Sequence, residues 1–531
     1  MNKHIKAPAR WDIPYGKGPD ETAIDALLAR PPFNAISDDR FRPETPLRGI
    51  LKNDSRLIDL PFGSVIYRQG DYGTSAFFVL EGEVRDVRPE SFGQAASHKP
   101  KRRRITSLHD LLTKPRHPEV RSVASYLRAR SEAALTTDPP RALIPDVLER
   151  PAQKIIKAGA LFGEIGALNR SPRAHTMVAS ANGTTVLEIR WQGLRDLMQA
   201  DAGLQEYVDQ RYREQALRPF LRKLPQLAGL DAPALQAIAD ATTFVTYGDY
   251  DWSVPYQQLI KNGSKPDEPI IVQEGDYAED IYILRSGFAR VHVEGQTTNY
   301  IGAGEVFALP TDAAAYPATL SAAGYAHLLK IPRALIPDAA PASTLPGSSL
   351  ARPKAPATPL DPELLGFMAE HRFLNGTAAM VINLDRCTRC DDCVRACAST
   401  HDNNPRFLRH GPTHGPLMVA QACMHCQDPV CLLGCPTGAI HRSPKGGQVI
   451  INDPACIGCG ACSNNCPYDA IRMVAIKDRK GHDVRTLDGF PIQKATKCDL
   501  CLDSHDGPAC VKACPHDALT RVDMRGLMGL A

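Results

Sequence analysis

Residues 387–397 read CTRCDDCVRAC, and this spacing of cysteines decides how the C-terminal part of the chain folds. The chain has 531 residues and 16 cysteines, and every cysteine lies between Cys387 and Cys514. Structural disulfides are spread through a secreted protein, whereas thiols gathered in one segment are typical of metal ligation. The C-terminal third is therefore predicted to fold around metal centres.

The cysteines form four groups of four with none left over. In each group the fourth cysteine follows the third by four residues. The groups are Cys387, Cys390, Cys393 and Cys397; Cys423, Cys426, Cys431 and Cys435; Cys456, Cys459, Cys462 and Cys466; and Cys498, Cys501, Cys510 and Cys514. Proline follows the last cysteine of three groups, and Ala398 stands in that place in the first.

This grouping favours cubane iron–sulfur clusters over the alternatives. A tight loop of thiolates can wrap three corners of one cluster, and the fourth cysteine, at the start of a helix, supplies a corner of a neighbouring cluster. Zinc sites use two separated pairs of cysteines, which the three-plus-one grouping matches poorly. Disulfides do not suit a reducing cytoplasm. All sixteen cysteines are therefore predicted to ligate four 4Fe–4S clusters, with His425 as a hydrogen-bond donor beside them.

The motifs DRCTRCDDCVRAC, CMHCQDPVCLLGCP and CIGCGACSNNCP also carry a family resemblance. Residues 380–520 resemble the iron–sulfur (beta) subunits of molybdopterin oxidoreductases of the dimethyl-sulfoxide-reductase-like, nitrate-reductase-like and formate-dehydrogenase-like kinds. In that family the outer two motifs share one pair of clusters and the inner two share the other. The resemblance implies a double bacterial-ferredoxin-like module with the following ligand sets: Cys387, Cys390, Cys393 and Cys514; Cys498, Cys501, Cys510 and Cys397; Cys423, Cys426, Cys431 and Cys466; Cys456, Cys459, Cys462 and Cys435.

The N-terminal two-thirds contains a repeat. Residues 61–87 read PFGSVIYRQGDYGTSAFFVLEGEVRDV, and residues 269–293 read PIIVQEGDYAEDIYILRSGFARVHV. The two stretches share a Gly-Asp-Tyr step and a later glycine at one constant offset. Both are rich in β-forming residues and are broken by glycine turns. Two copies of one β-rich module are therefore predicted.

Residues 162–178, FGEIGALNRSPRAHTMV, resemble the cyclic-nucleotide-binding domain, a β-roll flanked by helices. By that resemblance Gly163 begins a short helix whose amides face a phosphate. Arg173 would pair with the cyclic phosphate, and Glu164 would accept the ribose 2′-hydroxyl. Ala174 is the small residue typical of cAMP sites, so cAMP is the expected ligand. The alternative is a module that keeps the fold without a ligand.

In the second copy, VFALPTDAAAYPATL occupies the equivalent place. When Phe307 is aligned with Phe162, Leu309 replaces the glutamate and Ala318 replaces the arginine. An apolar pair cannot hold a cyclic phosphate, so this degenerate copy is predicted to be structural or to form an interface.

These segments predict a multidomain α+β protein. We expect an N-terminal extension (1–45), a first cyclic-nucleotide-binding-like domain (46–218) with an insert (88–154), a degenerate second domain (219–335), a Pro/Ala-rich linker (336–365) and a 4Fe–4S ferredoxin-type domain (366–531). The insert carries the basic run KPKRRR at 99–104, which is expected to be solvated; nucleic acid, an anionic membrane or an acidic partner are the alternatives.

Composition limits the partners and the compartment. The formal net charge of +3 is too small to attract nucleic acid or a membrane to the whole molecule. No segment approaches the about 20 consecutive apolar residues of a membrane span. Residues 1–18 lack the apolar core of a secretory signal, so the cytoplasm is expected. No helix-turn-helix pattern follows the first module, which argues against a transcription factor and a nucleic-acid partner.

We interpret the chain as an iron–sulfur electron-transfer protein or subunit, regulated by its β-roll modules. Its expected partner is a redox protein, such as a catalytic subunit that contains molybdopterin or flavin. The alternative is a stand-alone sensor of redox state and cyclic nucleotide that signals through protein partners. No catalytic constellation stands out, so no substrate site of its own is expected. A homodimer is a further expectation, because domains of the β-roll type often pair.

Overall fold

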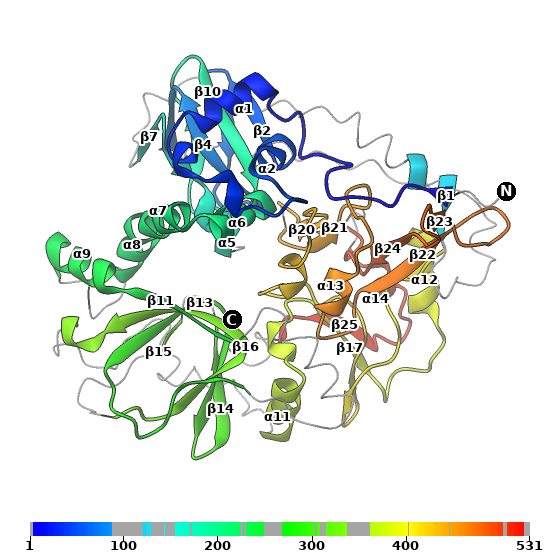
Figure 1. Ribbon diagram of the computed structural model, residues 1–531. Helices are drawn as coiled ribbons and strands as arrows, with labels where there is room; N and C mark the ends of the chain where they lie inside the picture. The colour runs from blue at the N-terminus through cyan, green and yellow to red at the C-terminus, as the bar shows by residue number, and fades with distance from the viewer. Residues whose placement is uncertain are drawn as a thin grey trace.

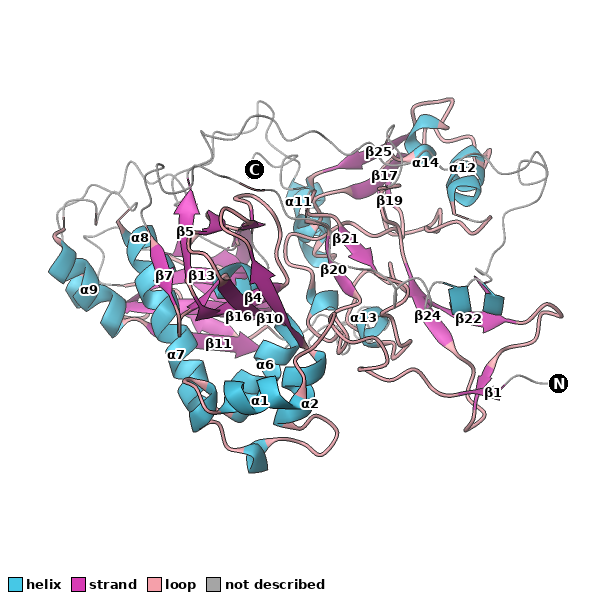
Figure 2. Cartoon of the chain, turned by 90° about the horizontal axis from the view of Figure 1, so that it is seen from above, coloured by secondary structure: helices cyan, strands magenta, loops and turns pink. Residues whose placement is uncertain are grey.

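The described part of the chain forms two β units and a cysteine-rich module, which we call the first β unit, the second β unit and the cluster module (Figure 1). The computed structural model describes residues 4–87, 121–124, 126–128, 143, 154–169, 172–222, 227, 230–248, 268–302, 305–307, 315–336, 362–401, 403–444, 446–502 and 507–524. The basic run at 99–104, Leu309 and most of the predicted linker lie outside these residues. Seen from above, the β units lie together on one side and the cluster module on the other (Figure 2).

The first β unit contains two four-stranded antiparallel sheets, in the orders β2-β10-β4-β8 and β3-β9-β5-β7. The strands are β2 (Ser55–Leu60), β3 (Val65–Tyr67), β4 (Ser75–Glu81), β5 (Glu83–Val87), β7 (Ile155–Lys157), β8 (Leu161–Phe162), β9 (Thr176–Ala179) and β10 (Thr184–Arg190). Gly82 has a φ of +80°, a conformation that glycine adopts without strain, and there the chain passes from β4 in one sheet to β5 in the other.

Helices cover the first β unit and bury its core. They are α1 (Glu21–Leu28), α2 (Leu47–Asn53), α5 (Glu164–Asn169), α6 (Trp191–Ala200) and α7 (Ala202–Tyr212). Ile24 of α1 and Phe33 pack into one buried cluster with Phe78 of β4, and the two phenyl centroids are 4.9 Å apart. Much of the predicted N-terminal extension therefore belongs to this unit.

The second β unit is one six-stranded antiparallel sheet in which β16 and β13 are the long central strands. Its elements are α8 (Arg218–Leu221), α9 (Ala232–Ala241), β11 (Thr243–Gly248), β12 (Ile270–Val272), β13 (Asp280–Val293), β14 (Gln296–Ile301), β15 (Val306–Phe307) and β16 (Thr319–Pro332). The helical segment from α7 through α9 lies between the two β units (Figure 1).

The sequence repeat is also a structural repeat. Phe77 pairs with Phe162 in the first β unit, and Tyr282 pairs with Phe307 in the second. A bridge between Tyr72 and Pro172 is matched by one between Tyr277 and Ala315.

The cluster module has short elements that separate its cysteine loops. They are α11 (Pro362–Glu370), β17 (Ala379–Asn383), α12 (Asp392–Thr400), β18 (Thr413–His414), β19 (Leu417–Val419), β20 (Ile440–Arg442), β21 (Val449–Ile451), α13 (Ala461–Asn464), β22 (Arg472–Lys477), β23 (Arg485–Thr486), β24 (Gln493–Thr496), α14 (Ala509–Lys512) and β25 (Leu519–Val522). Among the described helices, none has the length and apolar character needed to cross a bilayer.

Two distant segments also pair with the cluster module. The strand β1 (His4–Ile5) lies parallel to β23, and β6 (Arg121–Ser122), from the predicted insert, lies parallel to β22. Tyr126 of the insert is buried against Ile476 and Ile492. The described part of the insert therefore packs on the cluster module of its own chain, which the sequence analysis did not anticipate.

The buried core of the first β unit gives a stability prediction. Leu187 of β10 is fully buried, whereas Leu487 is 69% exposed in the cluster module. We expect Leu187→Ala to lower the free energy of unfolding of this unit by about 2–5 kcal/mol, because it leaves a cavity. The matched control, Leu487→Ala, should change it by no more than about 0.5 kcal/mol.

Urea unfolding followed by tryptophan fluorescence measures this difference, since Trp11 and Trp191 both lie in the first β unit. Equal urea midpoints for the two variants would contradict the assigned core.

Candidate iron–sulfur and nucleotide sites

The first and last cysteine motifs meet at one cavity. Cys387, Cys390, Cys393 and Cys514 line a space of about 20 Å³ whose other walls include Ile382, Ala518 and Leu519. The fourth thiol arrives from the far end of the module because β25, which follows Cys514, pairs with β17, which precedes Cys387. The sheet therefore brings the two ends of the module together.

A second cavity joins the two inner motifs. Cys435, Cys456, Cys459 and Cys462 line a space of about 20 Å³, together with apolar residues. Here too the fourth thiol comes from a different motif. The hairpin of β20 and β21, which lies between Cys435 and Cys456, folds the second motif back on the third.

The other eight cysteines lie in two further sets. Cys397 lies close enough to the thiols of the last motif for their charges to raise its pKa. Cys431 lies in the same way beside Cys466 and the thiols of its own motif. The sets are Cys397, Cys498, Cys501 and Cys510, and Cys423, Cys426, Cys431 and Cys466. The structure thus brings the sixteen thiols into the groupings that the resemblance implied.

The thiol environments fit a cluster that binds thiolates. Burial raises the pKa of Cys393 and of Cys510 to about 11. Such thiols are protonated at neutral pH unless a bound metal offsets the cost of burying the charge. Four sulfur donors in an apolar setting match the ligands that iron–sulfur clusters use.

The cysteine loops share a backbone feature. The second residue after the first cysteine of every motif has a positive φ: Arg389 (60°), His425 (51°), Gly458 (74°) and Leu500 (58°). Gly458 also approaches the carbonyl of Gln493 so closely that a Cβ would lie 2.1 Å from its oxygen. This turn bends each loop around a common centre, and at three of the four positions a non-glycine side chain holds a strained conformation.

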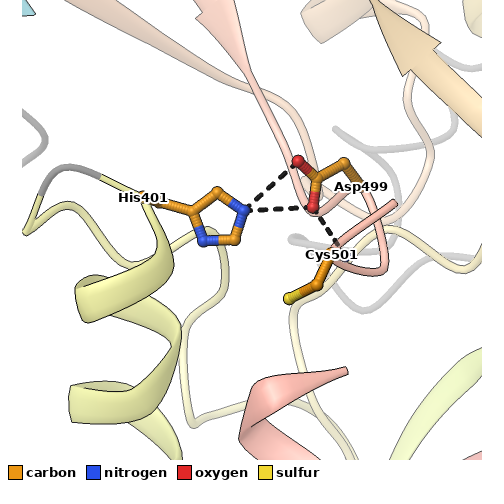
Figure 3. A group of neighbouring side chains, drawn as sticks. All are labelled: His401, Asp499 and Cys501. Carbon is orange, nitrogen blue, oxygen red and sulfur yellow. Dashed lines mark hydrogen bonds and ion pairs between the residues drawn. The ribbon is translucent and has the colours of Figure 1, made fainter. Parts of the chain in front are cut away.

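A polar group that the sequence analysis missed lies beside Cys397 (Figure 3). His401 Nε2 is 3.1 Å from Asp499 Oδ1, and the amide of Cys501 donates to that same oxygen at 2.9 Å. Burial raises the pKa of Asp499, but the hydrogen bond and charge of His401 hold it well below its usual value. His401 Nδ1 lies 3.7 Å from Cys397 Sγ. The group therefore surrounds one thiol set and forms no separate site.

In the first β unit the predicted nucleotide residues converge. Arg173 is buried, and its guanidinium donates to the carbonyl oxygens of Gly163 and Ser75. The guanidinium also lies 4.4 Å from the ring centroid of Tyr67.

Glu164, at the start of α5, is 1% exposed, and its carboxylate oxygens have no hydrogen-bond partner among the described residues. Burial raises its pKa. Ala174 is exposed.

In the second β unit a tyrosine takes the place of the arginine. Gly70 donates to the carbonyl of Arg173 at 2.9 Å, and Gly275 donates to that of Tyr316 at 2.9 Å. The structural counterpart of Arg173 is therefore Tyr316, whereas the alignment from Phe307 indicated Ala318. The two loops differ in length, and an alignment fixed at its start is displaced at its end. The tyrosine hydroxyl donates to the carbonyl of Asp280, so the described counterpart is again not a cation.

Both β units contact the second cysteine motif. Tyr72 N donates to Pro444 O at 3.0 Å, and the guanidinium of Arg442 lies 5.0 Å from the Tyr72 ring centroid. The same guanidinium donates to Cys426 O at 2.8 Å. From the second β unit, Tyr325 Oη donates to Asp428 Oδ2 at 3.0 Å. The loop of Cys426 is therefore held from two sides.

Comparisons with known proteins agree with this division. Two models described as "4Fe-4S dicluster domain" match residues 416–485 and 455–518. The electron transport protein HydN of Escherichia coli is 34% identical over 166 residues, which are 29% of this chain and 91% of HydN. The chain belongs to the ferredoxin-like iron–sulfur electron-transport proteins.

A second member of this family belongs to the anaerobic dimethyl sulfoxide reductase of Haemophilus influenzae. It is 36% identical over 156 residues, which are 25% of this chain and 68% of that protein. The matched segment makes up only 23% of AegA, a longer E. coli protein named as an oxidoreductase.

The β units have their own similarity. A model described as "Cyclic nucleotide-binding domain" matches residues 265–339, which fall in the second β unit. The regulatory domain of Toxoplasma gondii PKA, solved with cAMP, aligns over 60% of this chain and 92% of its own with 16% identity and a TM-score of 0.20. The chain is thus an iron–sulfur electron-transfer protein with a cyclic-nucleotide-binding-like domain.

The grouping of thiols gives a prediction about iron. Cys514→Ala should disturb the same cluster as Cys387→Ala, since both residues line one cavity. Each variant should lose about four iron per chain or lower the nuclearity of that one cluster. Thr388→Ala, a change between two of the ligands, is the control and should keep the full iron content.

Iron analysis and electron paramagnetic resonance (EPR) spectroscopy of the anaerobically purified variants measure this effect. Loss of different EPR signals in the Cys387 and Cys514 variants would contradict the grouping.

Proposed function

We propose that this protein conducts electrons through four 4Fe–4S clusters and that a cyclic nucleotide regulates it through two cyclic-nucleotide-binding-like domains, at 46–218 and 219–335. The cluster-binding domain covers 366–531, after an N-terminal extension (1–45) and a linker (336–365), and an insert lies at 88–154. The observation that carries the proposal is the convergence of thiols from distant motifs into four sets of four. Each set offers four sulfur ligands, and a bound cluster would supply reversible one-electron transfer.

The exposure of the thiols supports conduction through the module. Of the sixteen cysteines, only Cys390 and Cys459 are exposed, and they belong to the two sets that line the described cavities. The other two sets have no exposed member. We infer that electrons enter and leave at the sets of Cys390 and Cys459 and pass through the two enclosed sets.

A redox partner follows from this arrangement, because the described residues offer no acid–base pair placed for substrate chemistry. We propose a catalytic subunit that contains molybdopterin or flavin, as the name of the dimethyl sulfoxide reductase relative suggests. We propose the cytoplasm as its compartment and a homodimer as its assembly.

Anaerobic purification from the native host, followed by iron, sulfide, molybdenum and tungsten analysis, tests the proposal. About sixteen iron per chain together with a molybdenum-, tungsten- or flavin-containing partner is the expected result. About sixteen iron without any redox partner would favour a stand-alone sensor, and zinc in place of iron would refute the cluster assignment.

Nucleotide binding by the first β unit is supported by its buried charges. Arg173 is a guanidinium whose charge is matched by two carbonyl oxygens and an aromatic face, and Glu164 is an enclosed carboxylate nearby. A cyclic phosphate would give the guanidinium an anionic partner, and a ribose hydroxyl would give the carboxylate a donor. We propose cAMP as the ligand, bound by Gly163, Glu164, Arg173 and Ala174.

We expect Arg173→Ala to weaken cAMP binding by about 2–5 kcal/mol, because the phosphate would lose its buried counter-charge. Arg30→Ala is the control, since Arg30 is an exposed arginine of the same unit. Isothermal titration calorimetry measures both. Identical titration curves for wild type and Arg173→Ala would rule the site out.

Regulation is supported by a short series of contacts from Arg173 to the cluster module. A Cβ on Gly73 would lie 2.0 Å from Arg173 Nη2, so this glycine lies directly against the guanidinium. The next residue back, Tyr72, contacts Arg442, which in turn holds Cys426 O. A nucleotide that moves Arg173 would therefore act on a cysteine loop through two side chains.

We expect cAMP to change the rate at which a chemical donor reduces the clusters, and Tyr72→Ala to remove that change while cAMP still binds. Tyr277→Ala is the matched control, because Tyr277 occupies the equivalent position in the second β unit and is 71% exposed. Anaerobic stopped-flow absorption measures these rates. Rates that are the same with and without cAMP in the wild type would contradict regulation.

A further inference from the structure

Two cationic side chains and one histidine lie where the first and last motifs meet the inner motifs. We call Lys497, Arg521 and His425 the junction residues. They connect the loop of Cys498, from the last motif, with the loop of Cys423, from the second motif. The two loops belong to the two enclosed thiol sets, so the junction residues lie between the two halves of the module.

Arg521 contacts both loops directly. Its Nη2 donates to Cys498 Sγ at 3.1 Å, and its Nη1 donates to Cys423 O at 3.3 Å and Ala378 O at 2.9 Å. Arg521 lies on β25, whose pairing with β17 fixes its position. A guanidinium is thus in hydrogen-bond contact with one thiol of the last-motif set and with the backbone of the other set.

Lys497 and His425 complete the connection. Lys497 is 4% exposed, and its ammonium donates to Cys498 O at 2.9 Å and to Val449 O. The amide of Val449 donates to His425 Nδ1 at 3.1 Å, which leaves the ring proton on Nε2. His425 Nε2 is buried without a hydrogen-bond partner among the described residues. The histidine therefore presents a free N–H group inside the set of Cys423 and Cys426.

We propose that the junction residues set the reduction potentials of the two enclosed clusters, and so control the electron step between the two halves of the module. The inference rests on the proposed binding of four clusters. Reduction adds one negative charge to a cluster. A fixed cation or N–H donor beside its thiolates stabilises the reduced form more than the oxidised form. The junction residues therefore raise the potentials of the enclosed clusters and favour electrons moving inward from either exposed set.

Anaerobic redox titration of the full chain, followed by EPR, tests this proposal. In R521Q and in K497M we expect the ratio of oxidised to reduced enclosed cluster at a fixed potential to rise about tenfold, which corresponds to 59 mV for one electron. R521K keeps the charge and should remain closer to the wild type. The control is K480M, which removes a lysine charge in an exposed turn and should leave every potential unchanged.

The outcomes are distinct. Wild-type protein that lacks about sixteen iron refutes the proposed function itself, before any variant is compared. Full iron content with unchanged potentials in both R521Q and K497M overturns the role of the junction residues, and so does an equal shift in K480M. Loss of iron from R521Q alone leaves K497M to decide. Loss of iron from both would assign these residues to cluster assembly and would also overturn the proposal.

Discussion

Thiols that lie far apart in the chain must meet for the cluster module to exist. Cys514 reaches Cys387 only because β25 pairs with β17, and Cys435 reaches Cys456 only because β20 and β21 turn the chain back. The strands are three to five residues long and could not hold such a module by themselves. Burial keeps the free thiols protonated, so a bound metal is what makes their close approach favourable. The short strands place the cysteines, and the ligand bonds stabilise the arrangement.

The same dependence explains how the β units are attached. They contact the cluster module mainly at the second cysteine motif and its flanks, through side-chain donors that satisfy loop carbonyls. Arg190 donates to Thr437 O and Arg195 to Leu433 O at 2.8 Å. Loops wrapped around a metal centre cannot use their carbonyl groups in a sheet, and these arginines provide hydrogen bonds that would otherwise be missing. A sensor attached in this way contacts the part of the module whose shape depends on the cluster.

Sequence reasoning reached the ligand groups and the repeat because both leave local patterns. Cysteine spacing and the Gly-Asp-Tyr step are visible in a few residues. Tyr316 was missed because its equivalence to Arg173 depends on loop length, which only backbone hydrogen bonds reveal. Arg521, Lys497 and His401 were missed because each acts across many residues of sequence, although Lys497 and Asp499 flank Cys498 and could have drawn attention for that reason. The pairing of β6 with β22 rests on two residues without periodicity.

The shared cavity of Cys387 and Cys514 also bears on how the protein is made. A ribosome delivers the chain from its N-terminus, so the thiols of the second and third motifs emerge together, and the two inner sets are complete while the rest of the module is still being synthesised. The two sets that use the first motif must wait for cysteines close to the C-terminus. Three thiols of the first motif therefore remain without their partner through most of the synthesis of the module. In the cell, maturation of this protein has an order, and the outermost cluster comes last.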